Sequence, residues 1–77
     1  PKNNGKVQIG NMVTIQEDGQ KEETWTLVGA SEADLRHHKI SYFSPIGSSL
    51  MDKRIGDVAE VTLPNGSKIY YKILNIE

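Results

Sequence analysis

The sequence predicts an α+β fold in which a strongly twisted, mostly antiparallel sheet carries one short helix on one face. Two dipeptides, Asp18-Gly19 and Asn65-Gly66, lie between segments of alternating apolar and polar residues, the pattern of a β-hairpin. Ser44-Pro45 precedes a short apolar stripe and is typical of a helix start. Because an isolated two-stranded ribbon is only marginally stable, we expect both hairpins and the helix to share one core.

The first hairpin is predicted over residues 12–16 and 24–28, joined by a turn at residues 17–20. Residues 24–28 are β-branched or aromatic almost throughout, as expected of a strand. Alternation in both segments indicates one covered face. The side chains expected on that face are Val13, Ile15, Trp25 and Leu27.

Trp25 is the only tryptophan of the chain and allows two interpretations. Its ring could form the floor of a peptide-binding pocket, or it could anchor the core between Leu27 and the apolar stripe of the helix. We favour the core position, because so small a domain has little other aromatic volume to fill its centre.

Residues 31–35 fit either one helical turn or a loop. The basic cluster that follows, residues 36–39, contains His37 and His38. Two adjacent histidines could form a metal site or a pH switch. Sequence neighbours rarely face one metal, and no third ligand stands at a recognisable spacing, so we expect a solvated loop and assign the pair no chemistry.

A strand over residues 40–43 leads into the predicted helix. The Ser44 hydroxyl can cap the orphan amides of the first turn, and Pro45 at the first helical position loses no hydrogen bond. The helix should run for about two turns and stop before Gly56. Its buried stripe is expected to contain Ile46, Leu50 and Met51.

The second hairpin is predicted over residues 57–63 and 68–76. Val61 and Leu63 share one face of its first strand. The shared face of the second strand carries Ile69, Tyr71 and Ile73. We expect the two hairpins and the short strand at Ile40 to surround the one helix.

Composition excludes several classes of function. The 77 residues have a formal net charge of −1, which argues against a grip on nucleic-acid phosphates. The chain has no cysteine, so a disulfide framework, a thiolate nucleophile and a cysteine-based zinc site are absent. No apolar run reaches the length of a membrane span and no signal peptide precedes Pro1. We expect a soluble protein without cofactor, metal site, catalytic residues or membrane partner.

The central stretch resembles a known family. Ser41, Ser44-Pro45-Ile46-Gly47 and Ser49-Leu50-Met51 are similar to the signature of the C-terminal domain of the bacterial transcription elongation factors GreA and GreB. Further matches are Asn3-Asn4-Gly5-Lys6-Val7, Leu27-Val28-Gly29, Glu32-Ala33-Asp34 and Leu63-Pro64-Asn65-Gly66. The resemblance implies an FKBP-like domain over residues 7–77, preceded by a linker remnant at residues 1–6. The family's N-terminal coiled coil is absent from this chain.

The resemblance also implies a cytoplasmic, non-enzymatic role in which the domain docks on RNA polymerase at its secondary channel. The coiled coil then stimulates cleavage of backtracked transcript by the polymerase. The expected polymerase-binding residues are Phe43, Ser44, Pro45, Ile46 and Ser48. Phe43 stands where the family usually has a small polar or acidic residue, and Ser48 stands where arginine is common. A side chain as large as Phe43 is either tucked under the helix or offered to a partner.

Two other functions remain open at this point. The chain could belong to a Gre paralogue that regulates or inhibits the polymerase without stimulating cleavage. It could instead be a minimal FKBP-like prolyl isomerase, a reaction that requires an aromatic-lined cavity. Trp25, Phe43 and three tyrosines are few for both a core and such a cavity.

Overall fold

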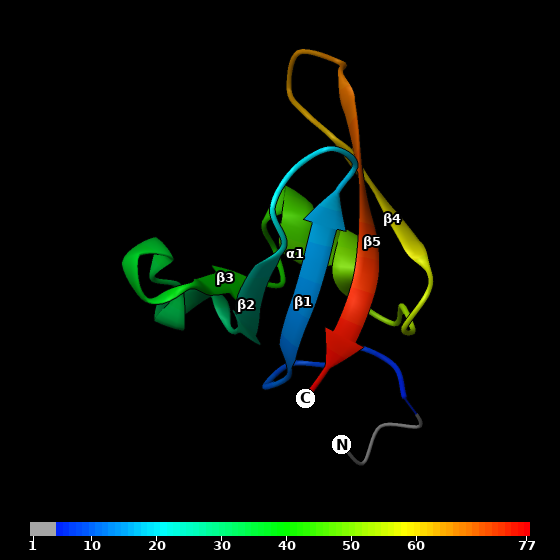
Figure 1. The fold of residues 1–77 in the computed structure, drawn as a ribbon. Coiled ribbons are helices and arrows are strands. Elements are labelled where there is room, and N and C mark those ends of the chain that lie inside the picture. Colours follow the sequence, from blue (N-terminus) through cyan, green and yellow to red (C-terminus); the bar gives the residue numbers. More distant parts are fainter. Residues whose placement is uncertain (1–4) are drawn as a thin grey trace.

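The computed structural model describes residues 5–77 and contains one curled sheet with a short helix against one face (Figure 1). The strands are β1 (Met12–Glu17), β2 (Glu23–Val28), β3 (Lys39–Ser41), β4 (Val58–Thr62) and β5 (Lys68–Ile76). The helix is α1 (Pro45–Leu50), and two 3-10 turns, η1 (Ala30–Glu32) and η2 (Leu35–His37), connect β2 to β3. The predicted α+β class is confirmed.

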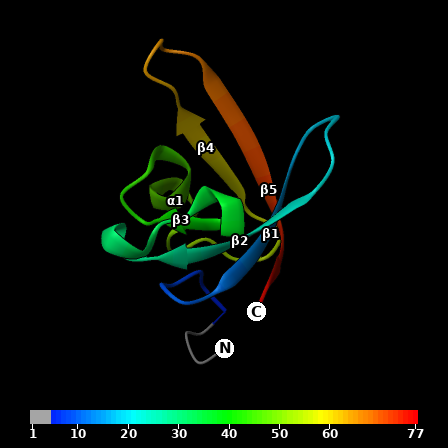
Figure 2. The same ribbon diagram turned by 90° about the vertical axis from the view of Figure 1, so that its left-hand side faces the viewer.

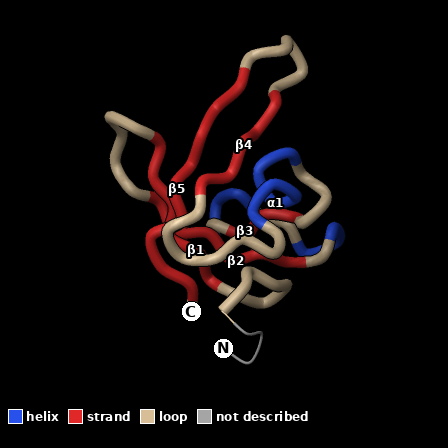
Figure 3. The backbone as a smooth tube through the Cα atoms, turned by 90° about the vertical axis from the view of Figure 1, so that its right-hand side faces the viewer, coloured by secondary structure: helices blue, strands red, loops and turns tan. Residues whose placement is uncertain are grey.

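The strand order is β3-β2-β1-β5-β4, and every neighbouring pair is antiparallel except β2 and β3. The β1–β2 and β4–β5 hairpins diverge from the base of the sheet, so their turns end far apart (Figures 2 and 3). This divergence expresses the strong twist expected of the sheet. Helix α1 packs beside β3 and β4.

The core lies between α1 and the facing side of the sheet. Its buried members are Val7, Val13, Ile15, Leu27, Ile40, Leu50, Ala59, Val61, Tyr71, Ile73 and Ile76. Most of the predicted covered faces of both hairpins are therefore confirmed. Trp25, Leu63 and Ile69 are the exceptions, since they are only partly buried and pack at the edge of this cluster. The Trp25 ring does not fill the centre because Ile15, Leu27, Leu50 and Ile73 already occupy it.

A β-bulge in β5 changes which of its last residues face the core. The register of β1 against β5 shifts between Thr14 and Ile15, which pair with Asn75 and Ile73 respectively. The extra residue on β5 breaks the strict alternation. As a result Ile73 and Ile76, three positions apart, are both buried.

Strand β3 is shorter than predicted. It ends at Ser41 and not at residue 43, because the Ser41 carbonyl accepts the Ser44 amide at 3.0 Å and turns the chain. The sequence left residues 31–35 open between one helical turn and a loop. In the structure, η1 and η2 are two short 3-10 turns separated by residues 33–34.

Only part of the predicted linker is described. Its first four residues lie outside the described residues, and Lys6 forms an isolated bridge with Arg54. Val7 then exchanges backbone hydrogen bonds with the segment after α1, at 2.8 Å to Lys53 and 2.9 Å from Asp52. Within residues 5–77, no helix has the length and apolar character needed to cross a bilayer.

Candidate functional site

Residues 41–48, here called the Ser-Pro turn, connect β3 to α1 and are fixed by two serine side chains. The Ser41 hydroxyl accepts the Phe43 amide at 2.9 Å, and the Ser41 carbonyl accepts the Ser44 hydroxyl at 2.8 Å. The Ser44 oxygen in turn accepts the Gly47 amide at 3.0 Å. The predicted N-cap at Ser44, with Pro45 at the start of the helix, is confirmed.

The close approach of α1 to β3 requires glycine at position 47. Gly47 is buried, and a Cβ atom there would clash with the Ser41 carbonyl oxygen. The helix then ends at Leu50, and Asp52 takes a left-handed conformation with φ 65°. Of the predicted stripe, Leu50 is fully buried, whereas Ile46 and Met51 are half-buried against the core.

The five predicted site residues all fall on the Ser-Pro turn. Phe43, Pro45 and Ser48 are exposed, while Ser44 and Ile46 are half-buried. The Phe43 ring is 70% exposed and rests on Tyr42, with ring centroids 4.3 Å apart. Of the two placements open from the sequence, the structure therefore has Phe43 outside the core.

An apolar groove of about 340 Å³ lies beside the Ser-Pro turn. We use this name for the hollow lined by Trp25, Leu35, Ile40, Ser44, Pro45, Ile46 and Leu63. The groove brings together three predicted site residues with four that belong to other parts of the chain. Phe43 and Ser48 do not line it.

Sequence reasoning missed Leu35 and Leu63 as site residues. Leu35 is 69% exposed although it is one of the larger apolar side chains. The signal available in the sequence was a single large apolar residue within the mostly polar residues 31–39. Leu35 lines the groove because η2 places it next to Ile40 and the Ser-Pro turn. Local sequence patterns do not reveal this placement.

Trp25 forms one wall of the groove and is held by two neighbours. Its indole N–H donates to the Glu23 carboxylate at 2.9 Å. The His38 ring stacks on it with centroids 4.9 Å apart and an angle of 22° between the planes. The Trp25 ring therefore packs against the edge of the core and also lines the groove, and the favoured prediction of a central core anchor is wrong. Its role as the floor of a peptide-binding pocket stays a prediction.

The two histidines make separate contacts. His37 Nδ1 lies 2.6 Å from an Asp34 carboxylate oxygen, whereas His38 Nδ1 lies 3.0 Å from the Thr24 carbonyl. Among residues 5–77 no group of three or more histidine, cysteine, aspartate or glutamate side chains is placed to hold a metal ion. Residues 36–39 are exposed, as predicted for a solvated loop. The contacts to Asp34 and Thr24 nevertheless hold both histidine rings in place.

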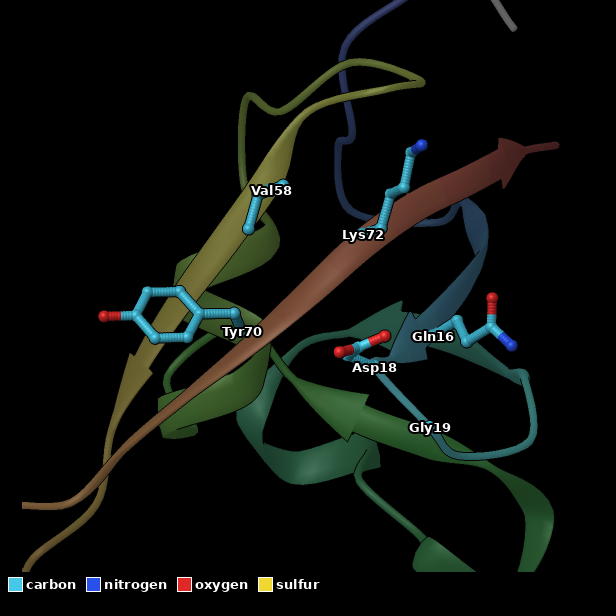
Figure 4. A pocket seen from close by; sticks show the side chains of 6 residues that line it. All are labelled: Gln16, Asp18, Gly19, Val58, Tyr70 and Lys72. Carbon is cyan, nitrogen blue, oxygen red and sulfur yellow. The ribbon is translucent and has the colours of Figure 1, made fainter.

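A second hollow, of about 260 Å³, lies on the opposite part of the sheet near the β1–β2 turn. Gln16, Asp18, Gly19, Val58, Tyr70 and Lys72 line it. Figure 4 shows the Tyr70 and Lys72 side chains pointing in different directions. The lining includes one acidic and one basic side chain, Asp18 and Lys72, and its polar groups do not converge on one point. The arrangement therefore favours no particular ligand.

Comparison with known proteins decides the family. A model described as transcription elongation factor GreA/GreB, C-term, matches residues 2–77. The chain belongs to this family. GreA of Staphylococcus saprophyticus is 46% identical over 76 residues, and GreA of Staphylococcus carnosus is 49% identical over 76 residues.

The GreA/GreB-family chain spans about half the length of these relatives. The match to the S. saprophyticus protein covers 97% of this chain and 48% of that protein. The match to the S. carnosus protein covers 96% of this chain and 47% of that protein. Solved structures agree with the fold. A GreA/GreB factor from Nitrosomonas europaea has TM-score 0.72 at 28% identity, covering 91% of this chain and 58% of that one.

A second similar structure is Gfh1, GreA factor homolog 1 of Thermus thermophilus. Its TM-score is 0.77 at 27% identity, and the match covers all of this chain and 52% of that one. The predicted resemblance and the FKBP-like α+β class expected from it are therefore confirmed at the level of the family fold. The family consists of transcription elongation factors and not of enzymes, so the prolyl isomerase alternative is not retained.

Proposed function

We propose that this domain binds bacterial RNA polymerase through the exposed side of the Ser-Pro turn. The contacting residues in this proposal are Phe43, Ser44, Pro45, Ile46 and Ser48. The observation that carries it is Phe43, a large apolar side chain that is 70% exposed on a turn otherwise held by hydrogen bonds. Membership of a transcription elongation factor family supports polymerase as the partner.

The turn suits a binding role because it is ordered before any partner arrives. Ser41 and Ser44 satisfy the backbone of the turn internally, and Pro45 fixes its own φ angle. Binding therefore loses little conformational entropy at these positions. Aromatic side chains such as Phe43 are enriched at protein interfaces, where they bury a large apolar area.

The finer proposal concerns where the domain docks and what the longer protein does. In it, the domain binds at the secondary channel, in the cytoplasm, and directs a coiled coil of a longer Gre factor into the polymerase. Acidic residues at the tip of that coiled coil then promote cleavage of backtracked transcript by the polymerase. The 77 residues alone would supply docking without cleavage stimulation.

A regulatory role is the second candidate. In this candidate, suggested by the likeness to Gfh1 with its TM-score of 0.77, the chain belongs to a Gre paralogue that acts on the polymerase without stimulating cleavage. A transcript-cleavage assay with the longer protein separates the two candidates. Stimulated cleavage supports the elongation-factor role, and binding with inhibition supports the regulatory one.

Binding is tested by titrating the 77-residue domain against bacterial core RNA polymerase. Phe43→Ser should weaken binding about tenfold, since most of a phenylalanine contact is lost. Ile9→Ser is the matched control, because Ile9 is 53% exposed but lies outside the Ser-Pro turn. Equal affinity of wild type and Phe43→Ser would exclude this surface, and no binding by the wild type would exclude the function.

A further inference from the structure

The tip of the β4–β5 hairpin carries a reactive pair of residues, Asn65 and Gly66, which are both exposed. In an Asn-Gly pair the glycine amide nitrogen can attack the side-chain carbonyl carbon of the asparagine, because glycine has no side chain to obstruct the approach. Among the described residues, nothing beyond the chain neighbours of Gly66 lies within 4 Å of the position that a Cβ atom would take. Asn65 is therefore a candidate for spontaneous deamidation.

The reaction needs only water and a base from the solvent. The Gly66 nitrogen gives its proton to the base and forms a bond to Cγ of Asn65. The carboxamide C–N bond then breaks, and the nitrogen takes up a proton and leaves as ammonia. Water hydrolyses the resulting cyclic imide at either carbonyl group. The products are aspartate and isoaspartate, the second of which carries the main chain through Cβ, and each adds one negative charge.

The folded turn holds both of the reacting groups. The Gly66 amide donates to the Leu63 carbonyl at 2.9 Å, and this bond covers the proton that the base must remove. The Ser67 amide donates to Oδ1 of Asn65 at 2.9 Å, which anchors the carboxamide. Pro64 fixes its own φ angle and is favoured at the second position of such a turn. Attack on Asn65 therefore requires that the turn first opens locally.

The β1–β2 turn offers a comparison within the same molecule. Gly19, like Gly66, is exposed and has a positive φ, at 81° and 89° respectively. The closing bond differs, because the amide that donates to the Glu17 carbonyl, at 2.9 Å, belongs to Gln20 and not to Gly19. The glycine amide thus forms the closing bond of the β4–β5 turn but not that of the β1–β2 turn.

We propose that Asn65 is a deamidation site whose reaction is controlled by opening of the β4–β5 turn. The folded domain deamidates slowly there, and the unfolded chain deamidates at the rate of a free peptide. Isoaspartate at position 65 adds a methylene group to the main chain between Leu63 and Ser67, whose backbone groups bond at 2.8 Å. This product therefore strains the closure of the turn. The inference is independent of polymerase binding.

Control by the turn is tested with Asp18→Asn, which places a second Asn-Gly pair in the β1–β2 turn. Both sites are followed at mildly alkaline pH by mass spectrometry of the tryptic peptides 7–21 and 55–68, in buffer and in guanidinium chloride. In buffer, position 18 should deamidate at least about tenfold faster than Asn65, the factor that about one net hydrogen bond provides. In guanidinium chloride the two rates should be similar.

Equal rates at the two positions in the folded protein would overturn control by the turn. The same holds if Asn65 reacts as fast in buffer as in guanidinium chloride. Absence of reaction at Asn65 in guanidinium chloride would overturn the site itself. Circular dichroism of the variant in buffer verifies that both turns are compared in a folded chain.

The effect of the product is tested on a chain that carries Asn4→Gln, which removes the other Asn-Gly pair of the sequence. The isoaspartate form is separated from the aged protein by chromatography. Its control is Asn65→Asp, which has the same charge on an ordinary backbone. We expect the isoaspartate form to melt about 4–8 °C lower than this control, as for loss of about one net hydrogen bond in a domain of this size. Equal melting temperatures would contradict the proposed strain on the turn.

Discussion

Ser44 links the backbone of the Ser-Pro turn to the start of α1. Its oxygen accepts the Gly47 amide while its hydroxyl hydrogen is donated to Ser41. One side chain thus caps the helix and closes the turn that presents Phe43. Loss of this hydroxyl should therefore affect both stability and the shape of the candidate surface.

Ser44→Ala should lower the free energy of unfolding by about 1 kcal/mol, the usual cost of losing an N-cap. Urea denaturation followed by circular dichroism measures the change. Ser48→Ala is the matched control, because the exposed Ser48 hydroxyl makes only a longer bond of 3.2 Å to the Pro45 carbonyl. A loss as large for Ser48→Ala as for Ser44→Ala would contradict the capping role.

Gly47→Ala should destabilise the domain by about 1–3 kcal/mol, because the new methyl group must displace the backbone at Ser41. The comparison is Gly29→Ala. There φ is −70°, and the nearest atom to an added Cβ is the movable Glu32 carboxylate at 3.4 Å. Thermal denaturation of both variants measures the difference, and equal melting temperatures would refute the close approach described for Gly47.

At the scale of elements, the connection from β2 to β3 builds half of the groove. The 3-10 turn η2 places Leu35 at the rim, and the left-handed His38 returns the chain parallel to β2. This conformation strains a branched side chain but suits asparagine. The position of the Trp25 wall therefore depends on the backbone at residue 38.

His38→Val should cost about 1–2 kcal/mol of stability relative to His38→Asn, since valine tolerates a positive φ poorly. His38→Asn keeps the backbone but removes the ring that stacks on Trp25. Denaturation curves measure the stability difference, and the emission of the single tryptophan reports loss of the stack in both variants. Equal stability of the two would argue against a left-handed residue 38.

Local signals were sufficient for the elements that depend on nearby residues. The Asp18-Gly19 and Asn65-Gly66 turns, the Ser44 cap and most of the covered strand faces were predicted correctly. The parallel pairing of β3, the bulge opposite Ile15 and the groove were not predicted. Each of these depends on contacts between residues distant in the chain, which periodicity and turn chemistry do not specify.

At the scale of the whole molecule, one small core supports both hairpins and α1. Tyr71 lies at its border, where burial raises the pKa of the phenol above its usual value of 10.0, with a further contribution from Glu17 and Glu23. The raised pKa means that the folded state favours the neutral phenol. Stability from this group is present below pH 10 and is lost as the pH rises through the folded-state pKa.

The domain should therefore lose stability above about pH 10, and Tyr71→Phe should lose less over the same range. Urea denaturation at pH 8, 10 and 11 measures the slope for each protein. Tyr70→Phe is the matched control, because it removes the same hydroxyl from a tyrosine that is 52% exposed. An unchanged slope for Tyr71→Phe would show that the buried phenol is not responsible.

The central claim is that the Ser-Pro turn faces RNA polymerase in the complex. The most direct test places a photoreactive phenylalanine analogue at Phe43 and irradiates the domain with core RNA polymerase. We expect a cross-link to a polymerase subunit from position 43 and none from the same analogue at Ile55, which is 57% exposed outside the turn. No cross-link from position 43, or equal cross-linking from both positions, would contradict the account.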